Sequence, residues 1–116
     1  MKKIALITGG TRGIGLGIAR KLAKSGLSMM NQVFAVKLAE FGIPVFEIQL
    51  GVIETDMTEK VKEIYQERIQ KGLTLEPNMG KPEDIGKVVA ALLRGDLSYA
   101  TGQIIAVDGG MMVGRL

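Results

Sequence analysis

Residues 8–15 read Thr-Gly-Gly-Thr-Arg-Gly-Ile-Gly and lie between an apolar run at 4–7 and a helical pattern at 16–24. This order predicts a strand, a tight turn and the start of a helix. Glycine lets the backbone approach a ligand closely, and the free N–H groups at a helix N-terminus attract negative charge. The segment therefore predicts a cradle for the phosphates of a dinucleotide. A tight turn without a ligand is the structural alternative.

Composition narrows the chemistry that the chain can perform. Its 116 residues fit one small domain, residues 1–116, and 47% hydrophobic with 23% charged residues is typical of a globular protein. The net charge of +3 suits an anionic ligand, but the 15 basic residues are interleaved with 12 acidic ones, so we expect no nucleic-acid partner. The sequence has no cysteine and no histidine, which argues against disulfides, imidazole catalysis and a metal site.

The first residues do not have the pattern of a targeting segment. Lys2 and Lys3 precede an apolar run of four residues, which is too short for a signal peptide. No run approaches the roughly 20 apolar residues of a transmembrane helix. We therefore expect a cytoplasmic protein without a membrane partner.

Hydrophobic periodicity predicts strands that alternate with helices. Strands are expected at 3–8, 45–49 and 103–107, and helices at 16–24, 30–41, 59–71 and 82–93. The continuous apolar character of the first strand predicts burial on both of its faces. Ser25 and Gly26 are expected to separate the first two helices. The chain should therefore form an α/β fold with a small, mainly parallel sheet of about three strands and about four helices.

Four segments stand in an order that is typical of a known family. Residues 8–15 fit a Thr-Gly-x-x-x-Gly-x-Gly turn, residues 51–57 fit a loop that covers a nicotinamide, and residues 101–103 and 108–110 flank a last strand. Together they resemble the short-chain dehydrogenase/reductase family, most closely its 3-oxoacyl-carrier-protein reductase-like branch. The resemblance covers nearly the whole chain and implies a truncated, doubly wound Rossmann-like fold.

The resemblance implies that the glycine turn and the nicotinamide loop bind NAD(P)(H). The cofactor-binding residues that it implies are Gly9, Thr11, Arg12, Gly13, Ile14, Gly15, Ile53 and Thr55. Arg12 can pair with a 2′-phosphate, which favours NADP(H) over NAD(H), although a solvated turn arginine is the alternative. For Thr55, the alternative is a cap for the following helix, together with Asp56 and Thr58.

The catalytic middle of the family is missing from this sequence. Residues 24–30 resemble the stretch that begins at the family's catalytic lysine, so Lys24 is the one catalytic candidate, with an ordinary surface lysine as the alternative. The tyrosine expected four positions earlier is replaced by Arg20, and neither Tyr65 nor Tyr99 has a lysine four positions later. The family's lysine lowers the tyrosine pKa for proton transfer. We therefore expect the chain not to be catalytically competent alone.

A deletion seam is predicted near residues 24–27. The family's first helix and its active-site helix cover opposite faces of the sheet, each roughly 10 Å from it. A link of two or three residues spans only about 7–10 Å and cannot cross the sheet. Either both helices lie on one face, or they form one long rod, or another chain completes the fold, or the sequence joins segments that are not contiguous in the molecule.

Three functions are compatible with these observations. The first is an oxidoreductase of the short-chain family, similar to ketone or 3-oxoacyl reductases, that lacks its serine and tyrosine. The second is a noncatalytic dinucleotide-binding or oligomerising module, which associates with itself or with full-length relatives through an apolar stripe at Phe34, Leu38 and Phe41. The third is a part of a longer, active reductase.

The uncovered stripe and the shortened sheet predict an oligomer. Apolar faces and strand edges that have lost their neighbours favour association. Light scattering at tens of micromolar protein should therefore give a mass above the 12.4 kDa of one chain. A single species with the mass of the monomer would contradict this prediction.

Overall fold

The computed structural model describes the backbone of residues 3–8 and 17–115, and the side chains of residues 3–6 and 25–115. The chain divides into two compact units. The first unit comprises Met1–Gln49 and Ala90–Ile105, and the second comprises Leu50–Val89 and Ala106–Leu116. The predicted phosphate turn at 9–15 lies outside the described residues.

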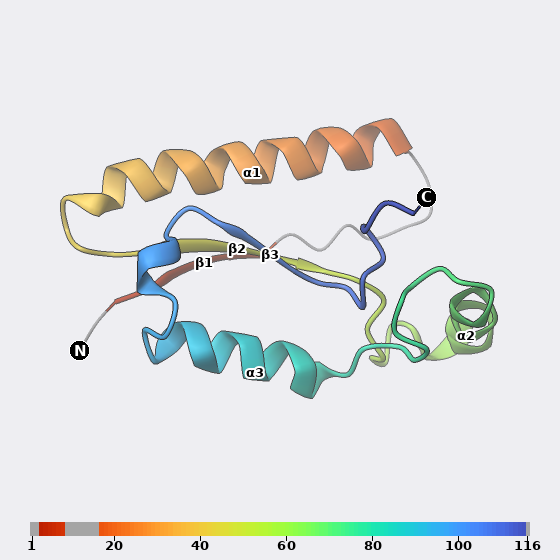
Figure 1. Ribbon diagram of the computed structural model, residues 1–116. Coiled ribbons are helices and arrows are strands. Elements are labelled where there is room, and N and C mark those ends of the chain that lie inside the picture. The colour runs from red at the N-terminus through yellow and green to blue at the C-terminus, as the bar shows by residue number, and fades with distance from the viewer. Residues whose placement is uncertain (1–2, 9–16, 116) are drawn as a thin grey trace. The chain divides into compact units, whose positions relative to one another are not determined.

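Most of a three-stranded sheet lies in the first unit (Figure 1). Its strands are β1 (Ala5–Thr8), β2 (Val45–Leu50) and β3 (Ile104–Val107), in the order β1-β2-β3. β1 and β2 are parallel, with Ala5 opposite Val45. The Glu47 N–H donates to the Gln103 carbonyl at 3.1 Å, and the Gly51 N–H donates to the Val107 carbonyl at 3.0 Å. Because these bonds advance in the same direction along both segments, the small parallel sheet that the sequence predicts is confirmed.

Burial on both faces occurs in β2 and not in β1. Val45, Phe46 and Ile48 are at most 1% exposed. Ala5 and Leu6 are only half-buried. The prediction of a fully buried first strand is therefore wrong at these positions, because β1 is an edge strand of the three-stranded sheet.

One helix crosses the predicted seam. Helix α1 (Gly17–Ala39) continues without a break through Ser25 and Gly26, so the prediction of two separate helices is wrong. A glycine inside a helix costs only about 0.5–1 kcal/mol relative to alanine, which is too little to stop a long helix. Of the alternatives for the seam, the structure has the single long rod, and α1 lies along one face of the sheet of its unit (Figure 1).

The helix predicted at 59–71 is present as the short helix η1 (Glu59–Val61) followed by α2 (Lys62–Gln70), and α3 (Pro82–Leu93) begins where it was predicted. The short helix η2 (Ser98–Ala100) was not predicted. The described chain thus has three α-helices where the sequence predicted about four, because the first two are fused. No helix in residues 3–8 or 17–115 is both long enough and apolar enough to cross a membrane.

Polar contacts join α1 and β2 to the turn before β3. The buried Asn31 amide donates to the Gly102 carbonyl at 2.8 Å. The Val45 N–H donates to the Thr101 hydroxyl at 2.9 Å, and the Val45 carbonyl accepts the Gly102 N–H at 2.7 Å. These bonds fix where the chain enters β3, because they satisfy backbone groups at the start of β2.

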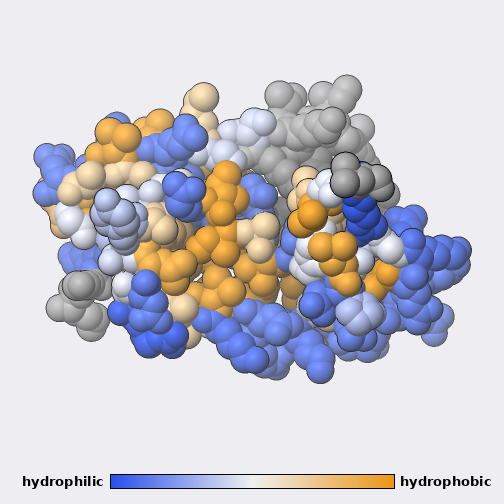
Figure 2. Space-filling view, in the orientation of Figure 1, coloured by the Kyte–Doolittle hydropathy of each residue, from blue (hydrophilic) through white to orange (hydrophobic). Residues whose placement is uncertain are grey.

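The predicted apolar stripe of α1 is largely uncovered. Phe34 is 41% exposed and Phe41, just beyond the helix, is 68% exposed, whereas Leu38 is half-buried. Met29 and Val36 extend the exposed apolar surface of this helix. Figure 2 shows hydrophobic side chains at the surface among hydrophilic ones. Such a surface is available for association, while the oligomeric state stays a prediction.

The continuity of α1 can be tested at Gly26. Among the described residues, no atom lies within 4 Å of a Cβ built at this position, so Gly26→Ala should raise the free energy of unfolding by about 0.5–1 kcal/mol in urea titrations followed by circular dichroism. Gly42→Ala is the matched control. Its φ of +66° is left-handed, so alanine there should lower stability by about 1–2 kcal/mol. Destabilisation by Gly26→Ala would contradict a helix that runs through the seam.

Candidate functional site

The loop that follows β2 begins with a close approach between two backbone segments. A Cβ built on Gly51 would lie 2.5 Å from the Cα of Asp108. The Gly51 N–H donates to the Val107 carbonyl at 3.0 Å. Only glycine lets this loop lie so close to the segment after β3, which explains the residue type at position 51.

Gly80 holds the middle of the same loop. The Gly80 N–H donates to the Val52 carbonyl at 3.0 Å, and the Gly80 carbonyl accepts the Glu54 N–H at 2.8 Å. The two bonds form an isolated parallel bridge between Ile53 and Gly80. In a parallel bridge the N–H and C=O of the residue between the bonded positions point away from the partner strand. Ile53 therefore presents its own backbone groups on the side opposite Gly80.

Thr58 closes the end of the loop. Its hydroxyl accepts the Thr55 N–H at 2.8 Å and lies 2.9 Å from the Ile53 carbonyl and 3.0 Å from the Thr55 carbonyl. η1 begins after Thr58 without a side-chain capping bond. Thr58, and not Thr55, holds the N-cap position of η1, and Thr55 lies in a turn that Thr58 stabilises.

An ion pair connects the loop to α2. The Lys62 ammonium donates to the Glu54 carboxylate, and both side chains are partly exposed. The hydrogen bond and the charge of Lys62 lower the pKa of Glu54, and Glu54 in turn raises the pKa of Lys62. Because the Glu54 pKa is lowered in the folded chain, this pair stabilises the fold above the ordinary glutamate pKa. Its contribution is lost as the pH falls through the lowered value.

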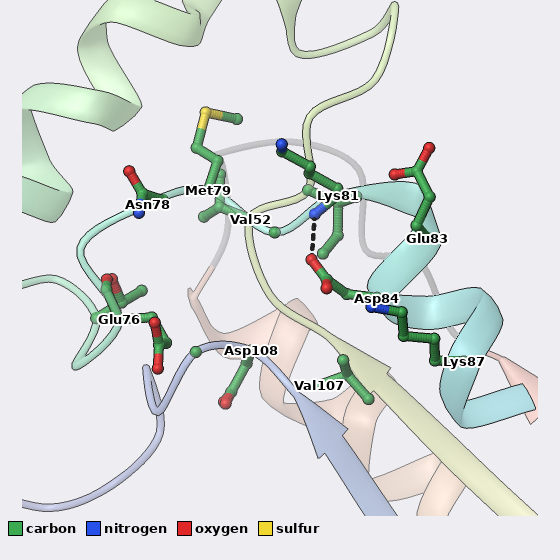
Figure 3. A pocket seen from close by; sticks show the side chains of 14 residues that line it. Val52, Glu76, Asn78, Met79, Lys81, Glu83, Asp84, Lys87, Val107 and Asp108 are labelled. Carbon is green, nitrogen blue, oxygen red and sulfur yellow. Dashed lines mark hydrogen bonds between the residues drawn. The ribbon is translucent and has the colours of Figure 1, made fainter. Parts of the chain in front are cut away.

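An open pocket of about 730 Å³ adjoins the loop within the second unit (Figure 3). It has an apolar wall, and its charged side chains come from three segments of this unit. The apolar wall consists of Val52, Ile53, Met79 and Val107, and the charged side chains are Glu76, Lys81, Glu83, Asp84, Lys87 and Asp108. Figure 3 shows Glu76 and Asp108 on one side of the pocket and Asp84 and Lys87 on the other.

Two of the carboxylates in the pocket stabilise backbone turns. Asp84 accepts the Lys81 N–H at 2.8 Å, which closes the start of α3 (Figure 3). Asp108 accepts the N–H groups of Gly110 at 2.9 Å and Met112 at 3.2 Å. With four carboxylates against two lysines the pocket does not favour a phosphate, whereas its apolar wall can hold a flat ring.

The structure brings two of the predicted site residues into one loop, Ile53 and Thr55. The predicted phosphate-binding residues lie outside the described part: Gly9, Thr11, Arg12, Gly13, Ile14 and Gly15. Lys24 belongs to α1, and its side chain is not among those described. Across the described residues, no group of acidic side chains is arranged to hold a metal ion.

The sequence prediction missed Gly80 as part of this site. It lies in residues 73–81, for which no regular element was predicted, and its role depends on a contact with a segment 27 positions earlier. The one local signal was that Gly80 stands two positions before Pro82, where α3 begins. A tight turn explains such a glycine equally well, so the pattern alone does not indicate a partner.

Gly51 allows a test of how the loop is built. Gly51→Ala should lower the free energy of unfolding by about 1–3 kcal/mol, because the new methyl group meets backbone that cannot rotate away. Gly114→Ala, where no atom of residues with a described position lies within 4 Å of the Cβ, should change stability by less than about 0.5 kcal/mol. Equal stability of the two variants in urea unfolding would show that the close approach at Asp108 is absent.

Known proteins are similar to this chain in sequence and in fold. The family model described as enoyl-(acyl carrier protein) reductase matches residues 7–112. A 3-oxoacyl-[acyl-carrier-protein] reductase of Thermotoga maritima is 37% identical over 91 residues, which cover 78% of this chain. A 3-oxoacyl-[acyl-carrier protein] reductase of Brucella melitensis, solved in complex with NAD, is 42% identical over 82% of this chain, with a TM-score of 0.76.

A third relative was solved with the other cofactor. An Agrobacterium tumefaciens protein, described as a 2-deoxy-D-gluconate 3-dehydrogenase with bound NADP, is 25% identical over 97% of this chain, with a TM-score of 0.79. The matches cover only 37% of the Thermotoga protein, 38% of the Brucella protein and 48% of the Agrobacterium protein. Since the family model nevertheless spans most of the sequence, the chain belongs to the short-chain dehydrogenase/reductase family.

Proposed function

We propose that this chain binds a nicotinamide dinucleotide, as a shortened relative of the ketone and 3-oxoacyl reductases. The observation that carries the proposal is the loop at 51–55, which Gly51 and Gly80 hold in a defined conformation beside an apolar pocket wall. Relatives solved with NAD and with NADP support this cofactor class. When bound, the cofactor would supply or accept the hydride.

Two segments of the chain would bind different parts of the cofactor. The glycine turn at 9–15 would hold the pyrophosphate, and Ile53 and Thr55 would contact the nicotinamide. Arg12 would pair with a 2′-phosphate, so NADP(H) is favoured over NAD(H). Of the two relatives named above, one was solved with NAD and the other with NADP, so this preference rests on Arg12.

Proton transfer is the step that we propose the chain does not perform by itself. Lys24 lacks the tyrosine partner that lysine needs in this chemistry, because Arg20 holds that position. Tyr99 is fully exposed in η2, and Tyr65 belongs to α2 in the second unit. Neither stands in a Tyr-x-x-x-Lys pair. The chain should therefore bind the cofactor without reducing a ketone.

A second candidate function is that of a noncatalytic module that assembles with itself or with full-length relatives. The observation that favours it is the exposed apolar surface of α1, where Met29 is 67% and Val36 is 78% exposed. A third candidate follows from the short coverage of the relatives, because a longer protein that contains this sequence would be an ordinary reductase. We propose the cytoplasm as its location in each case.

Cofactor binding can be measured through the fluorescence of NADPH and NADH, after the intact mass of the sample has been confirmed. We expect saturable binding that is tighter for NADPH. Gly13→Asp should abolish it, because a carboxylate in the phosphate cradle repels the pyrophosphate.

Gly114→Asp is the matched control for this measurement. It adds the same charge at a glycine with no atom within 4 Å of the Cβ, so binding should persist. Absence of binding by the unmodified chain at high micromolar cofactor would refute the proposal and leave the interaction module as the better function. Equal loss in both variants would show that the added charge acts nonspecifically.

A further inference from the structure

We propose that Gly80 is a positioning residue for the nicotinamide, acting through Ile53. The inference rests on the proposed function, because it assigns to Gly80 the control of the loop that would contact the cofactor. Gly80 does not itself need to touch the ligand. Its role would be to leave space for the Ile53 side chain and to direct the Ile53 backbone.

Two backbone hydrogen bonds of Gly80 hold the residues on either side of Ile53. Gly80 uses both its N–H and its C=O on the residues that flank Ile53, at 3.0 Å and 2.8 Å. This pattern fixes the peptide planes on both sides of Ile53. The Ile53 carbonyl lies 2.9 Å from the Thr58 hydroxyl, on the side away from Gly80. The position of Gly80 therefore determines the direction in which the Ile53 N–H points.

The Ile53 side chain also lies close to Gly80. A Cβ built on Gly80 would lie 2.7 Å from the Cδ1 atom of Ile53, and the next atom, the Val52 carbonyl oxygen, would be 3.6 Å away. Real Cβ atoms do not approach another atom to 2.7 Å, so one of the two groups must move. The Cδ1 atom is the end of a side chain that can rotate about χ2. Ile53 lines the pocket, so its rotation changes the wall that the ring would meet.

Gly80 differs from the other glycines of the second unit in what an added methyl group would meet. At Gly51, an added methyl group meets the backbone of Asp108, so a substitution there damages the fold. At Gly80, the one contact under 3 Å among the described residues is with the tip of the Ile53 side chain, so a substitution should preserve the fold and alter the site. A Cβ built on Gly86, inside α3, has no atom of the described part of the chain within 4 Å, so this glycine provides a control in the same unit.

The experiment compares each cofactor with the fragment that lacks nicotinamide. NADPH is paired with 2′-phospho-ADP-ribose and NADH with ADP-ribose, and affinities are measured by calorimetry for the unmodified chain, Gly80→Ala and Gly86→Ala. We expect Gly80→Ala to weaken binding of the whole cofactor by about tenfold and binding of the fragment by less than about twofold. Gly86→Ala should change neither affinity.

A second variant tests whether Ile53 transmits the effect. Valine lacks the Cδ1 atom, so Ile53→Val added to Gly80→Ala should regain most of the lost cofactor affinity. The two substitutions should therefore be non-additive in a double-mutant cycle. Additive losses would overturn the proposed path through Ile53.

The outcomes distinguish this inference from the proposed function. Equal weakening of cofactor and fragment by Gly80→Ala would assign Gly80 a structural role and overturn the inference alone. If the unmodified chain binds the fragment as tightly as the whole cofactor, the loop does not contact nicotinamide. That result would overturn the inference and the proposed contacts of Ile53 and Thr55, while binding of the phosphates by the glycine turn would stand. If the unmodified chain binds neither ligand, the proposed function and the inference are both wrong.

Discussion

Strand β2 receives hydrogen bonds along both of its edges, and the first unit depends on this arrangement. Its side chains Val45, Phe46 and Ile48 are almost completely buried, and each one removes enough apolar surface from water to contribute about 1.5–3 kcal/mol. β1 pairs with one edge from Ala5 to Thr8, and the segment around β3 pairs with the other. Removal of β2 would therefore leave two strands without a common partner.

The same strand also buries a charged side chain, which lowers the stability of the fold. Glu47 is 1% exposed; one carboxylate oxygen accepts the Gln49 amide at 3.1 Å, and the other has no hydrogen-bond partner among the described residues. The side-chain oxygen of the buried Asn31 also has no hydrogen-bond partner among the described residues. Each such oxygen opposes folding by about 1–3 kcal/mol. The apolar burial around β2 must offset this cost.

Local patterns predicted most of the elements but not how the seam is resolved. Pro82 with two acidic residues in the first turn marks α3, and the β-branched and aromatic residues after Pro44 mark β2, because these signals depend only on neighbours in the sequence. Gly26 indicated a break, but α1 passes through it, since helix continuity also depends on packing along the whole rod. The edge position of β1 could not be predicted from its own composition, because it depends on which strands are present beside it. In the second unit, the roles of Gly51 and Gly80 depend on contacts with residues 57 and 27 positions away, which no local pattern encodes.

The fold requires that β1 pairs directly with β2 of the same chain, and α1, which crosses the seam, connects the two strands. Isotope-filtered NMR on a mixture of labelled and unlabelled chains tests it most directly. The account predicts backbone NOEs in the register Ala5 with Val45 and Leu6 with Phe46 in uniformly labelled protein, and their absence from the filtered spectrum, because the pairing is intramolecular. The same NOEs in the filtered spectrum would show that another chain supplies the strand. Their absence from both spectra would show that the pairing does not form.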